Sequence, residues 1–413
     1  MDGKRLWFGV PTLEERFQPR DNALGLLRLV FALMVLVAHT WPLGFAWPGL
    51  GWLGVATQGR ANELALYGFF LLSGYLITGS GLTTTVRVFA RHRFLRIFPG
   101  YWACLLLTVG VFAPVTAWYE HAGTDWIWGH RGALGYLWTN LFASMEQYGI
   151  GDLLTTVPYR RVSGGSVFDG SLWSLKYELA CYLVVAVLAG TGLLRRRPWV
   201  VPAVAVAYYL VIAVGFLAGL PSRARPVFAG AVGPFPLLGS FNVNQVVYLA
   251  FVFFLGASIR LYGRRLPMHG AIAAACVVAL GVSVFLGGSD LIGLPAFAYL
   301  VFYLAVAAPR RLHRVGRRHD YSYGIYLYSF PVTQLAALVG ANRWGLGLFV
   351  LVVVAATLAL AIPSWHLIER PAMRRKDRPL GRLPHRGPRP AATAGAAPAA
   401  AVPAETEPVL GRR

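Results

Sequence analysis

The feature that most constrains this chain is a set of long apolar runs that recur along almost its whole length. Crossing about 30 Å of hydrocarbon takes roughly 20 mostly apolar helical residues at about 1.5 Å each. Ten runs have about that length, approximately 24–46, 62–82, 98–118, 171–192, 199–219, 241–262, 270–287, 291–308, 321–340 and 345–367. The seventh and eighth are short and contain glycine, so a hairpin or a tilted pair is an alternative there. The sequence therefore predicts an all-α polytopic membrane protein with about ten transmembrane helices.

Composition argues against an ordinary soluble domain. Hydrophobic residues make up 56% of the chain and charged residues only 13%, compared with about 45–50% and about 25% in soluble domains. The formal net charge of +21 would suit a nucleic-acid binder only if the basic residues lined one face. They lie instead in the segments between apolar runs, so we expect membrane lipids as partners and no nucleic acid. Cys104, Cys181 and Cys276 each lie inside an apolar run, so we expect no disulfide framework and no metal.

The distribution of basic residues predicts the orientation of the chain, because Lys and Arg accumulate in short cytoplasmic loops. With the N-terminus inside, 29 of the 38 Lys and Arg fall in the predicted cytoplasmic segments and 7 in the opposite ones. Both termini are therefore predicted to be cytoplasmic. We expect a cytoplasmic N-terminal segment at 1–23, a transmembrane domain at 24–368 and a disordered cytoplasmic tail at 369–413, which is rich in Ala, Pro and Arg. No cleavable signal peptide is expected, because about twenty polar residues precede the first run.

The segment 119–170 is the longest one predicted to lie outside the cytoplasm. Its apolar piece from Leu134 to Met145 is too short to span a membrane. We expect an interfacial or re-entrant helix there, covering a cavity that faces outward.

The first run contains two polar side chains, Arg28 and His39. Eleven helical residues turn through about 20° more than three full turns, so both lie on one face, roughly 16 Å apart along the axis. A histidine within the membrane can exchange a proton near neutral pH, as a general base for a hydroxyl must. The alternative is a histidine bonded to a backbone carbonyl, with Arg28 extending to lipid phosphate.

Two further polar sites flank later runs. Arg93 and Arg96 share a face just before the third run, where they can bind phosphates of a cytoplasmic ligand or of lipid head groups. Lys176 and Glu178 lie near the outer end of the fourth run and point about 200° apart, so each needs its own partner. Glu178 is a candidate to orient His39, and a structural ion pair between helices is the alternative.

Several motifs follow one another in a recognisable order. They are the Arg28/His39 pair, Phe69-Phe-Leu-Leu-Ser-Gly-Tyr-Leu-Ile77, Arg93-x-x-Arg96-Ile-x-Pro-x-Tyr101, Ser171-Leu-Trp-Ser-Leu-x-x-Glu178, Ser322-Tyr-Gly-Ile-Tyr-Leu-Tyr328 with Pro331, and Glu369-Arg-Pro371. Because of these motifs, the chain from about residue 22 to about residue 370 resembles the acyltransferase 3 family. The multi-pass membrane enzymes of this family modify bacterial surface polysaccharides and some small molecules. Leu179 and Tyr67 stand where many members are acidic, and Glu63, one turn before Tyr67, is a candidate replacement. The acidic partner of His39 is therefore left open.

The resemblance implies an enzyme of the bacterial cytoplasmic (inner) membrane. It would transfer an acyl group, with acetyl as the first candidate, from cytoplasmic acyl-CoA to a hydroxyl of an extracytoplasmic carbohydrate. By the same resemblance His39 is the catalytic base, Arg28 its companion and Glu178 the acidic residue, while Arg93 and Arg96 contact the donor.

We expect direct transfer, in which His39 takes the hydroxyl proton as the oxygen attacks the thioester carbonyl. A covalent relay through Ser73 is the alternative, although its small side chain beside Gly74 suits close helix packing. Two other functions stay open, namely acylation of a cytoplasmic small molecule and a transporter or flippase. The oligomeric state also stays open between a monomer and a homo-oligomer.

Overall fold

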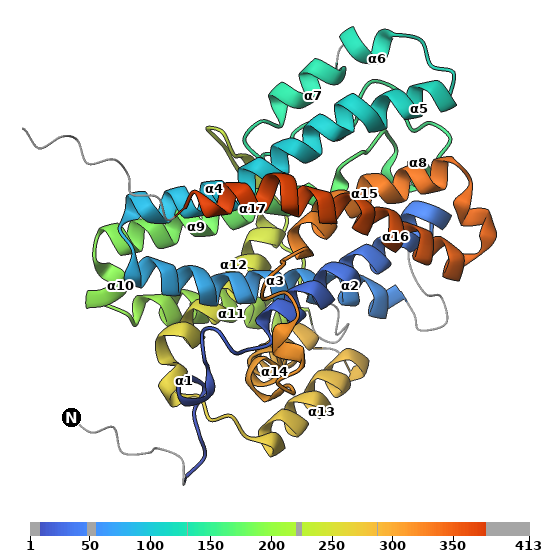
Figure 1. Cartoon of the computed structure of the whole chain (residues 1–413). Helices are drawn as coiled ribbons and strands as arrows, with labels where there is room; N and C mark the ends of the chain where they lie inside the picture. The colour runs from blue at the N-terminus through green and yellow to red at the C-terminus, as the bar shows by residue number, and fades with distance from the viewer. Residues whose placement is uncertain (1–8, 48–54, 130, 220–224, 287, 377–413) are drawn as a thin grey trace, which may run out of the picture. The chain divides into compact units, whose positions relative to one another are not determined.

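Helices occupy every apolar run in the computed structural model, which is drawn in Figure 1. The structure describes residues 9–47, 55–129, 131–219, 225–286 and 288–376, without the side chains of 55–61 and 284–286. These residues belong to one unit that ends at Lys376. Most of the predicted tail, from 377 to 413, and the first eight residues lie outside the described residues.

Among the described residues, eight helical segments are long and apolar enough to cross a membrane. They are Leu24–Phe45, Asn62–Thr83, Val86–Tyr119, Gly170–Gly190, Val200–Ala218, Val243–Arg265, Ser289–Ala307 and Leu346–Arg374. The two remaining runs form α13 (Gly270–Leu286) and α15 (Ser322–Leu338), each of 17 residues. The described chain is thus mostly helical, and its long apolar helices are those of a multi-pass membrane protein. The count of ten and the side on which the termini lie stay predictions.

The main helices of the bundle are separated by short helical pieces. The long ones are α2 (Leu24–Phe45), α3 (Val55–Thr83), α4 (Val86–Leu107), α9 (Leu175–Gly190), α11 (Val200–Ala218), α12 (Val243–Tyr262), α14 (Leu294–Ala307) and α16 (Leu346–Ser364). The short ones include α1 (Leu13–Arg16), α5 (Ala113–Tyr119), α10 (Leu193–Arg196), α17 (Arg370–Arg374) and the single turns η1 (Thr108–Phe112), η2 (Gly170–Ser174), η3 (Gly263–Arg265), η4 (Ser289–Gly293), η5 (Leu312–Arg314), η6 (Ala341–Trp344) and η7 (Trp365–Glu369). The described chain has one small antiparallel sheet, β1 (Ala231–Phe235) with β2 (Gly239–Asn242).

Helices α3 and α12 pack against each other through two glycines. A Cβ atom added to Gly74 of α3 would lie 1.9 Å from the carbonyl oxygen of Phe253, and one added to Gly256 of α12 would lie 2.0 Å from that of Leu71. Each glycine therefore faces the backbone of the other helix. The close packing expected at Gly74 is confirmed.

Helix α4 begins earlier than the apolar run predicted. The run starts near residue 98, but the helix starts at Val86, where the Thr85 hydroxyl accepts a hydrogen bond from the Val88 amide at 3.5 Å. Arg93 and Arg96, which hydropathy places before the third run, therefore lie inside this helix. Arginine is a good helix former, and a capping threonine supplies the start that hydropathy does not reveal.

The segment 119–170 folds into short helices, α6 (Asp125–Trp128), α7 (Ala133–Thr139) and α8 (Arg160–Ser163), which α5 precedes. The helix expected from Leu134 to Met145 thus ends at Thr139. Asn140 ends it, because its side chain donates to the Gln147 carbonyl and accepts from the amides of Glu146 and Gln147. Trp128 and Trp138 are 76% and 80% exposed, as is typical of side chains at a membrane interface.

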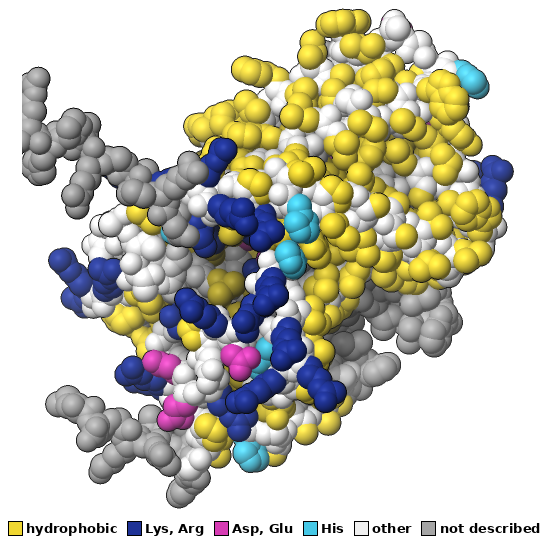
Figure 2. Space-filling view, in the orientation of Figure 1, with side chains coloured by type: hydrophobic (Ala, Val, Ile, Leu, Met, Phe, Trp, Pro, Cys, Tyr) yellow, Lys and Arg dark blue, Asp and Glu magenta, His cyan; other side chains and the backbone are white. Residues whose placement is uncertain are grey.

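The segments predicted to be cytoplasmic meet on one face. Figure 2 shows Lys and Arg gathered on one part of the visible surface, next to a wide apolar area. Polar contacts join these segments pairwise, namely Arg264–Glu14, His313–Asp21, Arg91–Arg375, Arg195–Leu82 and Arg96–Asp320. A topology that alternates between two sides of a membrane requires such a grouping.

Candidate functional site

A narrow cavity of about 120 Å³ lies among α2, α3, α4, α9 and α15. We call it the inner pocket. Its walls carry Arg28, Arg93, Arg96 and Glu178, so four of the five residues predicted for the site lie around one space. The fifth, His39, does not line it.

Asp320 holds two of these arginines. Its carboxylate lies 2.7 Å from a guanidinium nitrogen of Arg96 and 3.4 Å from one of Arg28, and it accepts a hydrogen bond from the Ser322 hydroxyl at 2.5 Å. Burial alone would raise the pKa of Asp320, but the two guanidiniums and the Ser322 bonds outweigh it and lower the pKa to about 2. Asp320 is the one acidic residue in the basic segment 309–320, and that signal in the sequence could have identified it.

Arg93 differs from Arg96 because, among the described residues, it contacts aromatic rings and not a carboxylate. Its guanidinium lies 5.9 Å from the ring centres of Phe89 and Tyr182, and its Nε is buried with no hydrogen bond. Within the described chain no carboxylate lies within 4.0 Å of it. Arg93 therefore brings a positive charge to the inner pocket that no described acidic side chain neutralises.

Glu178 binds hydroxyl groups in the same pocket. It accepts hydrogen bonds from the Ser73 hydroxyl at 2.8 Å and from the hydroxyl of Tyr182, one turn further along α9. Ser73 thus joins α3 to α9, while its neighbour Gly74 packs on α12. No hydrogen bond between Glu178 and His39 is present among the described residues.

His39 lies on α2 beyond an aromatic wall of the pocket. Its Nδ1 is 2.7 Å from the Val35 carbonyl oxygen, which can only accept, so in the neutral ring Nδ1 carries the hydrogen and Nε2 keeps its lone pair. The ring packs edge-on against Phe330 at 5.4 Å. Phe330 stands one turn after Tyr326, whose ring lines the inner pocket and packs against Phe69 at 6.2 Å.

The other membrane charges have their own partners, as was expected for Lys176. Lys176 is buried, donates to the Ser240 carbonyl at 2.7 Å and lies 3.7 Å from Glu146. Glu63, the candidate replacement for the missing acidic residue, pairs with Arg225. Both pairs fix helices to neighbouring loops, and neither contacts His39.

A second hollow of about 240 Å³ lies at the other end of α15. Tyr119, Glu120, Thr156, Asn342 and Arg343 line it. The segment 119–170 contributes Tyr119, Glu120 and Thr156 to its wall, whereas no residue of the apolar piece from Leu134 to Met145 lines it, so the cavity expected beneath that piece stays a prediction. We call this space the outer hollow.

Comparison with known proteins gives one family and two relatives. Residues 21–366 match the acyltransferase 3 family, described as an acyltransferase domain. An O-acetyl transferase of Shigella phage Sf6 is 27% identical over 361 residues, which cover 85% of this chain and 96% of the phage protein. Nodulation protein 10 of Rhizobium leguminosarum bv. viciae is 27% identical over 391 residues, which cover 88% and 96% of the two chains. No solved structure gives a significant match.

Proposed function

Because this chain belongs to the acyltransferase 3 family and is an O-acyltransferase with several membrane-spanning helices, we propose that it transfers an acyl group from cytoplasmic acyl-CoA to a hydroxyl of an extracytoplasmic carbohydrate. Acetyl is the first candidate, since the phage relative is named an O-acetyl transferase. The bacterial cytoplasmic membrane is the proposed location.

The observation that carries the proposal is the inner pocket. Ionisable groups inside a membrane domain are costly and mark function, and here three guanidiniums and a carboxylate surround one cavity. Arg93 has no carboxylate partner among the described residues, and Arg28 and Arg96 have N–H groups in addition to those that face Asp320, so all three can donate hydrogen bonds to the donor. The apolar walls around Phe69 and Tyr326 suit the acyl-bearing arm.

His39 is the proposed base, and its Nε2 is the atom that accepts the proton. As the acceptor oxygen loses its proton to Nε2, it attacks the thioester carbonyl carbon and forms the new C–O bond. The C–S bond then breaks, and the thiolate of CoA leaves and takes the proton from the imidazolium. His39 returns to its starting form, and no acyl-enzyme is needed.

The position of His39 along α2 supports access from both sides. Arg28, at the inner end of the helix, lines the inner pocket, whereas the carbonyl of Gly44, at the other end, accepts a hydrogen bond from Asn342 of the outer hollow. His39 lies between them, roughly 16 Å from Arg28 and roughly 7 Å from Gly44 along the axis. Hydroxyl, amide and charged groups beside the Tyr119 ring make the outer hollow our candidate entry for a carbohydrate.

We expect His39→Ala to lower the transfer of labelled acetyl from acetyl-CoA in isolated membranes by about 10²–10⁴-fold, because the step loses its general base. His366→Ala is the matched control. His366 makes the same kind of bond, from Nδ1 to the carbonyl of Ile362 at 2.9 Å, but its side chain is exposed and away from the inner pocket. Its activity should equal that of the wild type.

Wild-type transfer by His39→Ala would show that another group is the base.

The same assay, together with surface-glycan mass spectrometry of a deletion strain, distinguishes the proposed function from the two alternatives. A transporter releases no CoA, and an enzyme that acylates a cytoplasmic small molecule leaves the surface glycan unchanged.

A further inference from the structure

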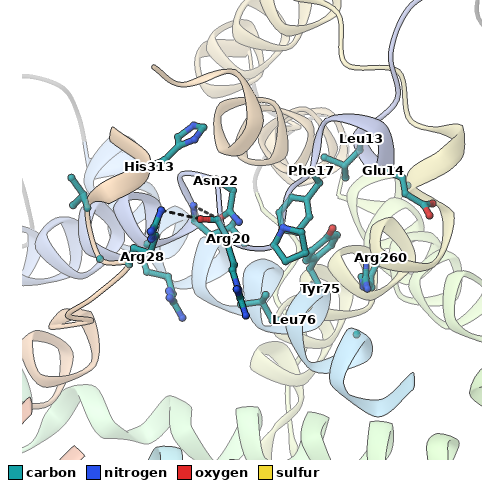
Figure 3. A pocket seen from close by; sticks show the side chains of 18 residues that line it. Leu13, Glu14, Phe17, Arg20, Asn22, Arg28, Tyr75, Leu76, Arg260 and His313 are labelled. Carbon is teal, nitrogen blue, oxygen red and sulfur yellow. Dashed lines mark hydrogen bonds between the residues drawn. The ribbon is translucent and has the colours of Figure 1, made fainter. Parts of the chain in front are cut away.

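A larger hollow of about 440 Å³ opens on the basic face. It lies between the N-terminal segment, the start of α2, the ends of α3 and α12, and residues 313–317. Figure 3 shows Arg20, Arg28 and Arg260 reaching it from three separate segments. We call this hollow the basic vestibule.

The vestibule has an excess of positive charge. Arg20, Arg260 and Arg317 line it, and in the described part of the chain none of them has a carboxylate within 4.0 Å. Arg317 donates to the Arg20 carbonyl at 3.4 Å, and Arg260 lies over the Tyr75 ring at 5.4 Å, contacts that leave most of their N–H groups available. The one acidic residue of the lining, Glu14, is paired with Arg264 at 2.9 Å.

A buried, unsatisfied nitrogen in the wall also points to a ligand. His313 is only 6% exposed, and its Nδ1 lies 2.8 Å from Asp21. Its Nε2 is buried and has no hydrogen-bond partner among the described residues. Buried polar atoms rarely stay unpaired, but this nitrogen has less than 1 Å² of accessible surface, so a bound molecule or water reaches it only by a shift of the wall.

The two cavities differ in volume, so they suit different parts of one ligand. Ligand pockets in proteins hold about 300–1,000 Å³, so the vestibule has room for a nucleotide, whereas the inner pocket does not. Both cavities are lined by Arg28 and Leu76, so these side chains stand between them. We propose that the vestibule binds the phosphorylated nucleotide end of the acyl-CoA donor through Arg20, Arg260 and Arg317, while the acyl arm passes Arg28 into the inner pocket. This assignment rests on the proposed function.

The phosphates of CoA and the guanidinium groups of the vestibule are chemically complementary. CoA carries a diphosphate and a 3′-phosphate, and guanidinium forks bind phosphate oxygens in a bidentate manner. Lipid head groups present the same phosphate chemistry, so the experiment must separate the two sources.

The test compares the double variant Arg260→Gln/Arg317→Gln with the wild type and with Arg318→Gln, which alters an exposed neighbour outside the lining. The full-length protein is purified in neutral detergent, and the unfolding temperature of each variant is checked. Equilibrium binding of CoA and the kinetics with acetyl-CoA and with acetyl-pantetheine, which lacks the phosphates, are then measured.

We expect the double variant to raise the Kd for CoA and the KM for acetyl-CoA about 10–100-fold, with kcat changed less than twofold. Kinetics with acetyl-pantetheine should equal those of the wild type, and Arg318→Gln should have no effect. Unchanged CoA binding in the double variant, or an equal loss with acetyl-pantetheine, would overturn the assignment.

Nanodiscs of different lipid composition test whether the vestibule binds lipid head groups or the CoA donor. If phosphatidylglycerol in place of phosphatidylcholine abolishes CoA binding by the wild type, and the double variant is insensitive to that exchange, the vestibule is a lipid site and the assignment is wrong. Failure of the proposed function has another signature: CoA binding then still depends on Arg260 and Arg317, but no acetyl reaches a carbohydrate.

Discussion

Asp169 is a buried carboxyl group that relies on neutral partners. It accepts a hydrogen bond from the Tyr136 hydroxyl at 2.6 Å and lies 3.6 Å from the Cys104 sulfur. No basic side chain lies within 4.0 Å of it in the described chain. Burial outweighs these hydrogen bonds and raises its pKa from 3.8 to about 6.

The stability of the protein should therefore depend on pH through Asp169. Its folded pKa lies above the unfolded value, so the folded state binds more protons between about pH 4 and about pH 6, and this contribution to stability falls as the pH rises through that window. Asp169→Asn still accepts from Tyr136 but does not titrate. We expect the unfolding temperature of the wild type to fall relative to that of Asp169→Asn over this window. Parallel curves for the two proteins would contradict the role given to burial.

The contact between α3 and α12 depends on the absence of two side chains. Neither the Phe253 carbonyl, which faces Gly74, nor the Leu71 carbonyl, which faces Gly256, can move aside without separating the helices. This contact holds α3 in place. Ser73, the residue before Gly74, donates a hydrogen bond to Glu178 in the inner pocket. Packing and site geometry are therefore linked at adjacent positions of one helix.

We expect Gly74→Ala and Gly256→Ala each to destabilise the protein by about 1–3 kcal/mol or more, because each forces a carbon against a backbone oxygen. Gly281→Ala in α13 is the control, since nothing lies within 4 Å of the added carbon. Alanine is the better helix former, so that variant should be unchanged or more stable by up to about 1 kcal/mol. Thermal unfolding in detergent measures all three, and an unfolding temperature for Gly74→Ala equal to that of the wild type would contradict the packing argument.

At the scale of elements, hydropathy locates the apolar centre of a helix better than its ends. The first, fourth and fifth runs agree with helices within a few residues, because these helices are apolar along most of their length. The first part of α4 was missed because its arginines lower the hydropathy without preventing helix formation. Helix α7 ended early because the side chain of Asn140 bonds to the backbone that follows.

For the whole molecule, the grouping of basic segments on one face predicts which positions are reached from each side. Arg310 belongs to a predicted cytoplasmic segment, while Arg343 lines the outer hollow on the opposite side of the predicted topology. Cys104 and Cys181 are buried, so only Cys276 needs removal before labelling.

In a Cys276→Ser background, we expect a membrane-impermeant maleimide to label Arg343→Cys in intact cells and Arg310→Cys only after the membrane is opened. Labelling of Arg310→Cys in intact cells would reverse the predicted orientation. Labelling of both positions from one side would contradict the count of spans between them.

The site could be predicted in part, because residue types and their order along the chain identify candidates but not their partners. Arg28, Arg93, Arg96 and Glu178 surround one cavity, although the sequence placed Glu178 beside His39 near the outer end of its run. Asp320 was missed because its pairing depends on how distant helices pack. The missing acidic partner of His39 has a related explanation, since a carbonyl of its own helix orients the ring.

Asp320 has a consequence for the end of each catalytic cycle. In the proposed binding mode the donor passes Arg28, so it meets a carboxylate already in contact with that guanidinium and competes with an anion of the protein as well as with water. When the spent carrier leaves, the same carboxylate replaces it. On the proposed function, such a resident counter-ion would limit product inhibition and prepare the empty enzyme for the next thioester.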